Sequence, residues 1–406
     1  MNVAQVSLLT GCRDKPYALG LVTALAAAGV QVDFIGSNEL DSSELRANPQ
    51  INFLNLRGDQ SDDAGLLQKM ARILIYYFQL IVYAAGARPK IFHVLWNNKF
   101  ELFDRTVLML YYKLLGKKTI LTAHNVNAGK RDANDSWLNR ATLKIQYLLC
   151  DHIFVHTKKM KCELLAEYGV PEKKVSVIPL GINHTVPNTA LTGTEARRRL
   201  GIGARDKAIL FFGQIAPYKG LEFLVAAFDE LAKKDSSHRL IIVGRPKGPK
   251  SYWDEIKETM ARGDARGRII QKIEFVPDAE TELYFKAADV LVLPYIRVFQ
   301  SGVLFLGYSF GLPVIAADVG SLKEEIFEGK TGFVFEAKSA TALTQTIQNY
   351  FESDLYRELN VRRREIQDFA NDRYSWSKVA ALTMAVYSKL LPAKKHYCAH
   401  CAPEKL

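Results

Sequence analysis

The segment from Ala208 to Phe335 alternates short apolar runs with amphipathic stretches, and this alternation restricts the possible folds more than any other feature. Short continuous apolar runs, here of three to five residues, are typical of strands buried on both faces of a parallel sheet. The amphipathic stretches then predict crossover helices that cover those faces. The apolar runs are Ala208–Phe212, Leu240–Val243, Val290–Leu293 and Val314–Ala316.

The first half of the 406-residue chain alternates in the same way, so we expect two parallel α/β domains. The expected strands are Val3–Leu9, Val30–Gly36, Lys90–Trp96, Thr119–Ala123, Asp151–Val155 and Lys174–Ile178. The expected helices are Asp14–Ala28, Gly65–Ala85, Phe103–Leu115, Asp135–Leu149 and Thr157–Tyr168, followed late in the chain by Ala340–Glu352, Asp354–Phe369 and Ser375–Leu391.

A stretch rich in Pro, Gly, Asn and Thr follows Ile178 and predicts the linker between the domains. We therefore place the first domain at residues 1–185 and the second at residues 186–372. A last helix at 373–391 and a flexible tail at 392–406 complete the expected organisation.

The composition, 48% apolar and 24% charged, is that of a globular protein. The run Ile73–Ala87 is too short to span a bilayer and predicts a buried or interfacial helix. The N-terminus lacks the pattern of a signal peptide, and the five cysteines are few and mostly isolated. We expect a cytoplasmic protein, with the inner face of the cell membrane as the alternative site.

The net charge of +11 suggests an anionic partner, although charge that serves only solubility explains it as well. The candidate partners are nucleic acid, a phosphorylated substrate and an anionic membrane face. Because no helix-turn-helix, zinc-finger or RNA-binding aromatic signature is present, we expect no nucleic-acid partner.

A diphosphate site is expected where the run Ala208–Phe212 ends. Gly213 and Gln214 form a turn there, and a helix begins near Lys219 and Gly220. The backbone amides of a helix N-terminus, together with an ammonium group, suit a diphosphate. A solvated lysine at a helix start is the alternative interpretation.

Further candidates lie at the ends of neighbouring strands, where open parallel sheets bind their ligands. The turn Gln300, Ser301, Gly302 and Val303 opens a helix whose amides could receive phosphate. Arg245, after the run Leu240–Val243, is a second possible cation.

In the first half, the strand Thr119–Ala123 is followed by His124 and Asn125, which we expect to face the cleft. The loop after the first strand holds candidate acceptor contacts, whereas three other histidines are expected to be packed or structural. The loop residues are Gly11, Arg13, Asp14 and Lys15, and the three histidines are His93, His152 and His156.

These motifs resemble those of glycosyltransferase family four, whose retaining enzymes have the GT-B fold of two facing Rossmann-like domains. The resemblance implies that Val276 and Pro277 line the nucleobase pocket, that the histidine at His124 contacts the transferred sugar and that the last helix returns to the first domain. Two glutamates common in the family are absent, since Val298 and Leu306 occupy their positions. Glu324, or its neighbour Glu325, could substitute for one of them.

We therefore expect a metal-independent transferase that moves a sugar from a nucleoside diphosphate sugar to a hydroxyl group, in polysaccharide or glycolipid synthesis. His124 and Lys219 are its expected catalytic residues, and no cofactor is expected. The pair Cys398 and Cys401 is a weak metal motif without a second half-site. A nucleotide-sugar epimerase is the alternative function.

The acceptor is expected to be a saccharide or a lipid-linked sugar. The apolar run Ile73–Ala87 and the lysines near Tyr111 and at Lys158–Lys161 fit a peripheral enzyme at an anionic membrane. A core helix and solvated lysines would give the same pattern.

Overall fold

The first sheet of the protein consists of seven parallel strands. The computed structural model describes residues 5–11, 14–61, 65–131, 135–182 and 186–391. In these residues the strand order is β3-β2-β1-β4-β5-β6-β7. The bounds are β1 (Gln5–Leu9), β2 (Gln31–Gly36), β3 (Ile51–Asn55), β4 (Ile91–Val94), β5 (Lys118–Ala123), β6 (His152–Val155) and β7 (Val175–Val177).

Helices cover both faces of this sheet, and together they form the first lobe. One face packs against α1 (Lys15–Ala27) and α18 (Trp376–Leu390). The other face packs against α3 (Leu66–Gly86), α5 (Met109–Leu114), α7 (Trp137–Leu149) and α8 (Lys158–Tyr168). The shorter elements are η1 (Asn38–Leu40), α2 (Ser43–Ala47), α4 (Glu101–Phe103), η2 (Asp104–Leu108), α6 (Ala128–Arg131) and η3 (Glu172–Lys174).

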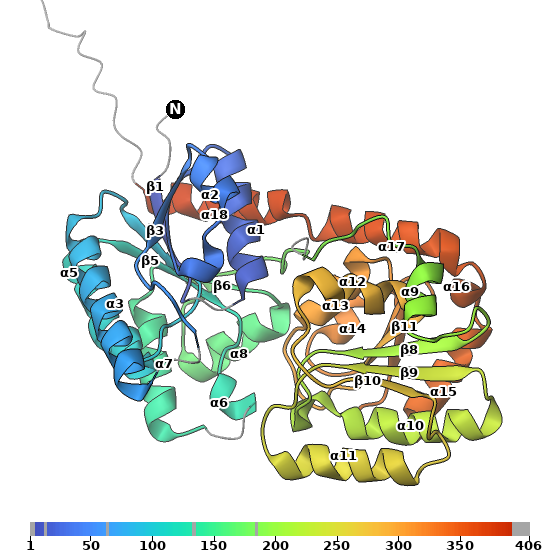
Figure 1. The fold of residues 1–406 in the computed structure, drawn as a ribbon. Helices are drawn as coiled ribbons and strands as arrows, with labels where there is room; N and C mark the ends of the chain where they lie inside the picture. Colours follow the sequence, from blue (N-terminus) through green and yellow to red (C-terminus); the bar gives the residue numbers. More distant parts are fainter. Residues whose placement is uncertain (1–4, 12–13, 62–64, 132–134, 183–185, 392–406) are drawn as a thin grey trace, which may run out of the picture.

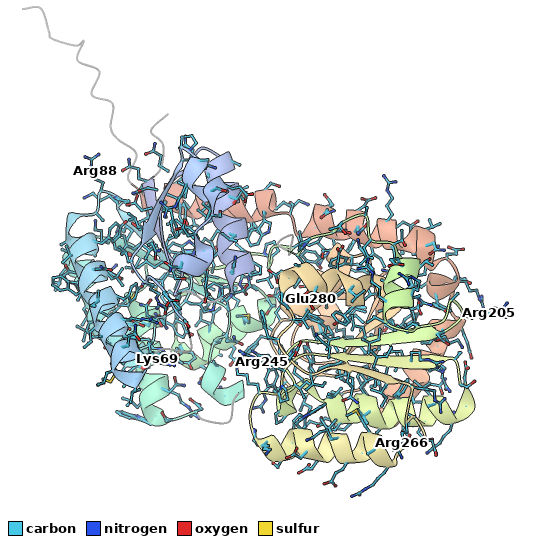
Figure 2. The ribbon with its side chains drawn as sticks, in the orientation of Figure 1. Lys69, Arg88, Arg205, Arg245, Arg266 and Glu280 are labelled. Atoms are coloured by element: carbon cyan, nitrogen blue, oxygen red, sulfur yellow. The ribbon has the colours of Figure 1, made fainter. Side chains whose placement is uncertain are left out.

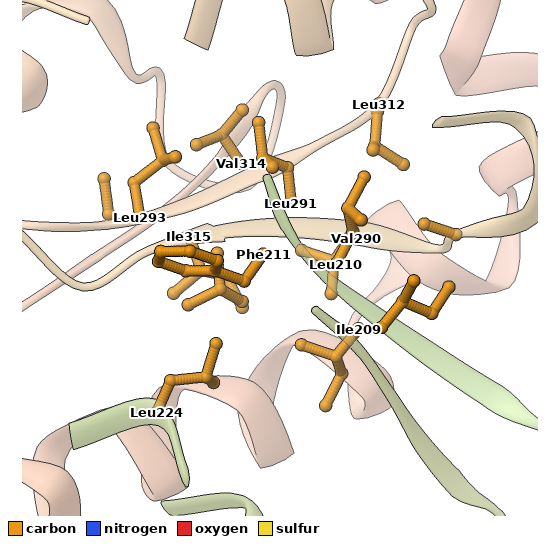
Figure 3. Packing of buried hydrophobic residues seen from close by; sticks show 14 of the residues in the cluster. Ile209, Leu210, Phe211, Leu224, Val290, Leu291, Leu293, Leu312, Val314 and Ile315 are labelled. Carbon is orange, nitrogen blue, oxygen red and sulfur yellow. The ribbon is translucent and has the colours of Figure 1, made fainter. Parts of the chain in front are cut away.

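The second sheet has six parallel strands in the order β10-β9-β8-β11-β12-β13. Its strands are β8 (Lys207–Phe212), β9 (His238–Val243), β10 (Ile269–Lys272), β11 (Val290–Leu293), β12 (Val314–Ala317) and β13 (Gly332–Phe335). Figure 3 shows Phe211 of β8 and Ile315 of β12 within one apolar cluster, which also includes Leu224. The apolar runs therefore form the buried sheet that the sequence predicts.

The second lobe consists of this sheet and its helices. They are α9 (Gly193–Arg199), η4 (Pro217–Lys219), α10 (Leu221–Lys234), α11 (Lys250–Arg262), α12 (Asp278–Ala287), α13 (Gly302–Ser309), α14 (Leu322–Glu325), α15 (Ala340–Glu352), α16 (Asp354–Arg357) and α17 (Leu359–Arg373). The two lobes lie side by side, and the red helices α17 and α18 run from the second lobe to the first (Figure 1).

Helix α18 is packed into the first lobe, which confirms the expected return of the last helix. The hydroxyl of Tyr387 on α18 lies 2.7 Å from Nδ1 of His93 on β4. Trp376, at the start of α18, packs its ring against two glycines, Gly20 of α1 and Gly181 after β7. A Cβ atom at Gly20 would lie 2.1 Å from the ring, and one at Gly181 would lie 2.3 Å from it. The two glycines therefore leave the space that the ring fills.

Three strands were not expected from the sequence: β3, β10 and β13. Each is an edge strand of its sheet. Most residues of β3 and all residues of β10 are at least partly exposed, so neither sequence shows a continuous apolar run. The expected helix Asp354–Phe369 is divided into α16 and α17, which continues to Arg373.

Candidate functional site

A cavity of about 290 Å³ lies between the lobes. The first lobe contributes Asp14, Pro16 and Tyr17 at the start of α1, and Trp376 at the start of α18. The second lobe contributes the turn before α10 and the start of α13. Its lining residues are Tyr218, Lys219, Val298, Gln300, Ser301, Gly302, Val303, Phe305 and Leu306. Two sequence-predicted turns of the second lobe therefore meet at one cavity, opposite the first lobe.

Lys219 ends the 3₁₀ turn η4, and only 8% of it is exposed. Its ammonium group donates to the hydroxyl of Tyr295 at 2.5 Å and lies 3.9 Å from the centroid of that ring. The next residue, Gly220, has φ 64°, and a Cβ atom there would lie 2.0 Å from the carbonyl oxygen of Pro294. Glycine therefore lets the turn approach β11 closely enough to hold Lys219 in the cavity wall.

The start of α13 faces the same cavity. Ser301 is the N-cap residue, and its side chain makes no capping hydrogen bond with the first turn. The Ser301 hydroxyl instead lies 3.3 Å from the Tyr295 hydroxyl, so Tyr295 connects Ser301 to Lys219. The first amides of a helix have no partner within the helix and carry the positive end of its dipole. An anion in the cavity would therefore meet an ammonium group and helix amides together.

Three further residues at or near the start of α13 line the cavity, one polar and two apolar. The buried Oε1 atom of Gln300 has no hydrogen-bond partner among the described residues. Val298 and Leu306 occupy the positions of the two family glutamates, and both line the cavity. The wall is therefore apolar where related enzymes carry carboxylates, and the amide of Gln300 supplies polarity there.

The remaining donor candidates lie outside the lining of this cavity. Gly213 has φ 111°, and Gln214 beside it is partly exposed. Arg245 is exposed and lies on the side of the second lobe that faces the first lobe (Figure 2). Val276 is buried and Pro277 is exposed at the start of α12.

The glutamates of α14 differ in their surroundings. Glu324 is exposed and does not line the cavity. Glu325 is buried, accepts a hydrogen bond from the Tyr374 hydroxyl, and is therefore engaged in packing α14 against the end of α17. Neither glutamate replaces the missing carboxylates in the cavity wall.

His124 belongs to an aromatic cluster behind Tyr17. Its ring stacks on Trp96 with centroids 3.8 Å apart and meets Tyr17 edge-on at 4.7 Å. Its Nδ1 atom lies 3.0 Å from Nε2 of His156. From the sequence, His156 was expected to be structural, and its contact with His124 was not predicted. Ala123, the last residue of β5, is paired with Val155, the last residue of β6. A histidine follows each of these residues, and this could have indicated that His124 and His156 lie side by side.

The hydrogen bonds of these two histidines define their protonation. Burial lowers the pKa of His156 to about 4, and burial together with the neighbouring His156 and His93 lowers the pKa of His124 well below its ordinary value. Both rings are therefore neutral near pH 7. Nδ1 of His156 lies 3.2 Å from the carbonyl oxygen of Ile178, which can only accept, so Nδ1 carries the proton.

With that proton on Nδ1, Nε2 of His156 must accept the proton of His124 Nδ1. Nε2 of His124 is then a bare acceptor, and it has no hydrogen-bond partner among the described residues. Within the described residues, the pair thus leaves one buried, unpaired acceptor, Nε2 of His124.

The other candidates of the first lobe are only partly brought together. Asp14 lines the cavity, with φ 47°, and its carboxylate accepts from the Tyr17 amide at 3.2 Å. Gly11 is buried, Lys15 is exposed and Asn125 is partly exposed; none of the three lines the cavity. Arg13 lies outside the described residues.

His93 is buried and bound to Tyr387 and Thr122, as the packed interpretation predicted. His152 is buried too. Pro277 is the N-cap of α12, and Asp278 lies in its first turn.

A second cavity, of about 550 Å³, adjoins the first at Val298 and was not predicted. Its first-lobe wall carries charged residues, among them Lys130, Asp135 and Glu163. Arg297 of the second lobe donates to the carbonyl oxygen of Lys130 at 2.7 Å, so the two lobes are in contact here. These residues come from four separate segments, and no single sequence motif marks them.

Two features of the described residues concern metal and membrane. No group of three or more His, Cys, Asp or Glu side chains in them is placed to hold a metal ion. No described helix is long and apolar enough to cross a bilayer. The pair Cys398 and Cys401 lies outside the described residues.

Two family models match the chain, one in each lobe. The model described as Glycosyltransferase Family 4 matches residues 16–186. The model described as Glycosyl transferases group 1 matches residues 206–353. Together the two matches cover every strand of both sheets except β1.

Similar proteins extend this comparison over the whole chain. The D-inositol 3-phosphate glycosyltransferase of Corynebacterium glutamicum is 25% identical over 96% of each chain. Sucrose-phosphate synthase from Thermosynechococcus elongatus has a TM-score of 0.73 at 20% identity, covering 95% of this chain and 99% of that one. Anabaena HepE in complex with UDP and glucose has a TM-score of 0.72 at 15% identity, covering 96% and 100%. These structures share the two-lobed arrangement.

Proposed function

Because this chain belongs to glycosyltransferase family four and is a nucleotide-sugar glycosyltransferase with the GT-B fold, we propose that its donor diphosphate binds at Lys219, Ser301 and Gly302. The observation that carries this proposal is the cavity in which the ammonium group and the start of α13 meet residues of the first lobe. The sugar would be transferred with retention of configuration at its anomeric carbon, as is usual in the family.

The proposed role of these groups is to stabilise the leaving group. Negative charge develops on the β-phosphate as the glycosidic bond breaks. Lys219 and the amides at the start of α13 are fixed before the reaction, so they stabilise this charge without reorganisation. They would supply the stabilisation that other transferases obtain from a divalent cation, and we propose no metal ion or cofactor. The Gln300 amide would bind a donor hydroxyl group.

We propose that His124 positions the transferred sugar. The support is its bare Nε2 atom, which can accept a hydroxyl proton from the sugar ring. His124 lies behind Tyr17 rather than in the cavity lining, so the sugar would extend past Tyr17 toward the first lobe. Asp14 at the cavity edge would contact the acceptor. Gly213, Gln214, Arg245, Val276 and Pro277 would surround the rest of the nucleotide.

We propose a saccharide or a lipid-linked sugar as acceptor, on the cytoplasmic side of a membrane and with no nucleic acid as partner. The relative from Corynebacterium glutamicum is a D-inositol 3-phosphate glycosyltransferase, so an acceptor bearing phosphate is one class to test. The basic net charge supports an anionic acceptor or surface.

A nucleotide screen tests the donor site directly. We expect UDP, GDP or ADP to raise the melting temperature, because a ligand that binds only the folded state stabilises it. With a matched sugar donor and acceptor, free nucleoside diphosphate should accumulate with the glycosylated product. An intact isomerised nucleotide sugar without release of the nucleotide would instead indicate epimerase activity and contradict the proposal.

A further inference from the structure

Helices on the outer side of the first lobe present apolar side chains to solvent. Of the 21 large hydrophobic residues that are exposed in the described chain, 16 lie between Leu66 and Leu148. They are Leu66, Leu67, Met70, Leu74, Ile75, Phe78, Val82, Phe100, Leu102, Val107, Leu110, Leu114, Trp137, Leu138, Ile145 and Leu148. We call the nine of these residues that lie on α3 and α5 the outer apolar face. Such a concentration marks an interaction surface rather than scattered exposure.

The helix periodicity makes this face continuous along α3. Residues Leu66, Met70, Leu74, Phe78 and Val82 recur at intervals of four and therefore form one stripe. The opposite side of α3 is buried through Tyr76, Tyr77, Leu80 and Ala84. The core therefore does not need the exposed stripe, which is available for another contact.

Neighbouring helices extend the stripe sideways. The hydroxyl of Tyr111 on α5 donates to the carbonyl oxygen of Ile81 on α3 at 3.0 Å, so the two helices are adjacent. In Figure 1 they form the outer edge of the first lobe, on the side away from the second lobe. On α5, Leu110 and Leu114 repeat the interval of four and are both exposed.

The charges around this face are mainly positive. Residues 65–118 contain nine Lys and Arg residues and two acids, Glu101 and Asp104. Three of the cations are paired with acids outside this range: Arg72 with Asp59, and Lys113 and Lys118 with Asp151. Glu101 is ion-paired with Arg105, and Asp104 is buried. Lys69 and Arg88 lie at opposite ends of α3 (Figure 2). The stripe therefore has cationic groups at both ends.

We propose that the outer apolar face docks on an anionic lipid bilayer, with α3 lying in the plane of the membrane interface. Apolar side chains would enter the acyl boundary, while the flanking cations would contact anionic headgroups. A second copy of this chain fits the face less well. A two-fold interface pairs each patch with itself and would place the cations of one copy against those of the other.

The inference deepens the proposed function, because a docked first lobe would hold the acceptor side of the cavity near lipid-linked sugars. Bilayer binding itself requires neither a donor nor catalysis. The two proposals can therefore fail separately.

Cosedimentation of the full chain with vesicles tests the docking proposal. The vesicles are phosphatidylcholine alone, or an equal mixture of phosphatidylcholine and phosphatidylglycerol. We expect binding to the mixed vesicles that weakens at high salt and is much weaker on phosphatidylcholine. The double variant L74Q/F78Q should lower the partition coefficient about tenfold, because two inserted side chains are lost.

The matched control is Val361→Gln, which changes an exposed apolar residue on α17 of the second lobe. It should bind vesicles like the unchanged protein, and all variants should keep the same far-UV spectrum and nucleotide-induced thermal shift. The proposal is overturned if the protein binds neither vesicle, or if L74Q/F78Q binds as well as V361Q. It is equally overturned if sedimentation shows a dimer that only L74Q/F78Q dissociates, since a second copy would then occupy the face.

Discussion

At the residue scale, the cavity between the lobes brings together Lys219, Ser301 and Gly302 from two helix starts of the second lobe. These helix starts were visible in the sequence, whereas His124, which directly follows a strand, lies outside the cavity lining. Partners supplied by packing were not predictable in the same way. Tyr295 is fully buried and joins Lys219 to Ser301, yet in the sequence it is only an aromatic residue after an apolar run.

The first residue-scale prediction concerns the ammonium group of Lys219. The substitution Lys219→Met keeps an apolar stem of similar length but removes the positive charge. We expect turnover to fall by roughly a hundredfold or more, as for other groups that stabilise a leaving anion. Nucleotide-induced thermal stabilisation should decrease with it. The control is Lys330→Met, which removes an exposed lysine of the second lobe. Full turnover and full stabilisation in K219M would exclude Lys219 from the diphosphate site.

The second residue-scale prediction is that the buried histidines make the stability of the protein depend on pH. The pKa of His156, about 4, and that of His93, about 3, are lowered by burial in the folded protein. As the pH falls below about 6.5, the unfolded chain binds protons that the folded chain does not. The free energy of unfolding should therefore fall toward pH 4, by up to about 1.4 kcal/mol per pH unit for each histidine.

Urea unfolding at pH 7 and pH 5 measures this loss, and H156Q provides the comparison. The variant has one titrating histidine fewer, so its stability should depend less steeply on pH. An identical dependence in the variant and the unchanged protein would show that His156 does not contribute. The difference between the two proteins isolates this histidine from carboxyl groups that also titrate in this range.

At the element scale, buried strands and long helices were predictable, whereas three of the four edge strands, β3, β10 and β13, were not. The apolar runs of β8, β9, β11 and β12 encode burial on both faces. Edge strands lack this signal because solvent covers part of their surface. The helix α3 shows the opposite limit. Its apolar run was predicted to be buried or interfacial, but the sequence alone could not show that one stripe is exposed.

The turn between β8 and α10 carries the element-scale prediction. In Gly220→Ala, the alanine would have to adopt a positive φ, and its Cβ atom would lie 2.0 Å from the carbonyl oxygen of Pro294. Gly201→Ala is the matched control, because its φ is 68° but its Cβ would meet no atom within 4 Å. Both variants should lose about 1 kcal/mol from the positive φ. We expect the steric overlap to lower the free energy of unfolding of G220A by at least about 2 kcal/mol more. G220A should also lose nucleotide binding. Equal unfolding free energies would contradict this assignment.

At the scale of the whole molecule, the lobes are joined where Trp376 meets Gly20 and Gly181. The indole nitrogen also donates to the carbonyl oxygen of Ile182 at 2.8 Å. The two sheets and the last helix were predictable because each has its own apolar pattern, whereas the return of that helix to the first lobe was implied only by the family resemblance. The lobe contacts, such as the bond from Arg297 to the Lys130 carbonyl, come from loops without such a pattern.

The whole-molecule prediction is that Trp376→Ala releases α18 from the first lobe. We expect a loss of about 3 kcal/mol in the free energy of unfolding, as for other large aromatic truncations. Hydrogen exchange in residues 376–390 should become faster. Leu382→Ala is the control, since this residue on the same helix is 46% exposed. Unchanged exchange in W376A would show that the indole does not anchor the helix.

The chain passes between the lobes twice, once after β7 and once before α18. The two passages are bonded to each other, because the amide of Ile182 donates to the carbonyl oxygen of Tyr374 at 3.0 Å. Both connections between the lobes therefore pass through one hydrogen-bonded point. We expect any relative movement of the lobes to pivot about this point, because no other covalent connection joins them.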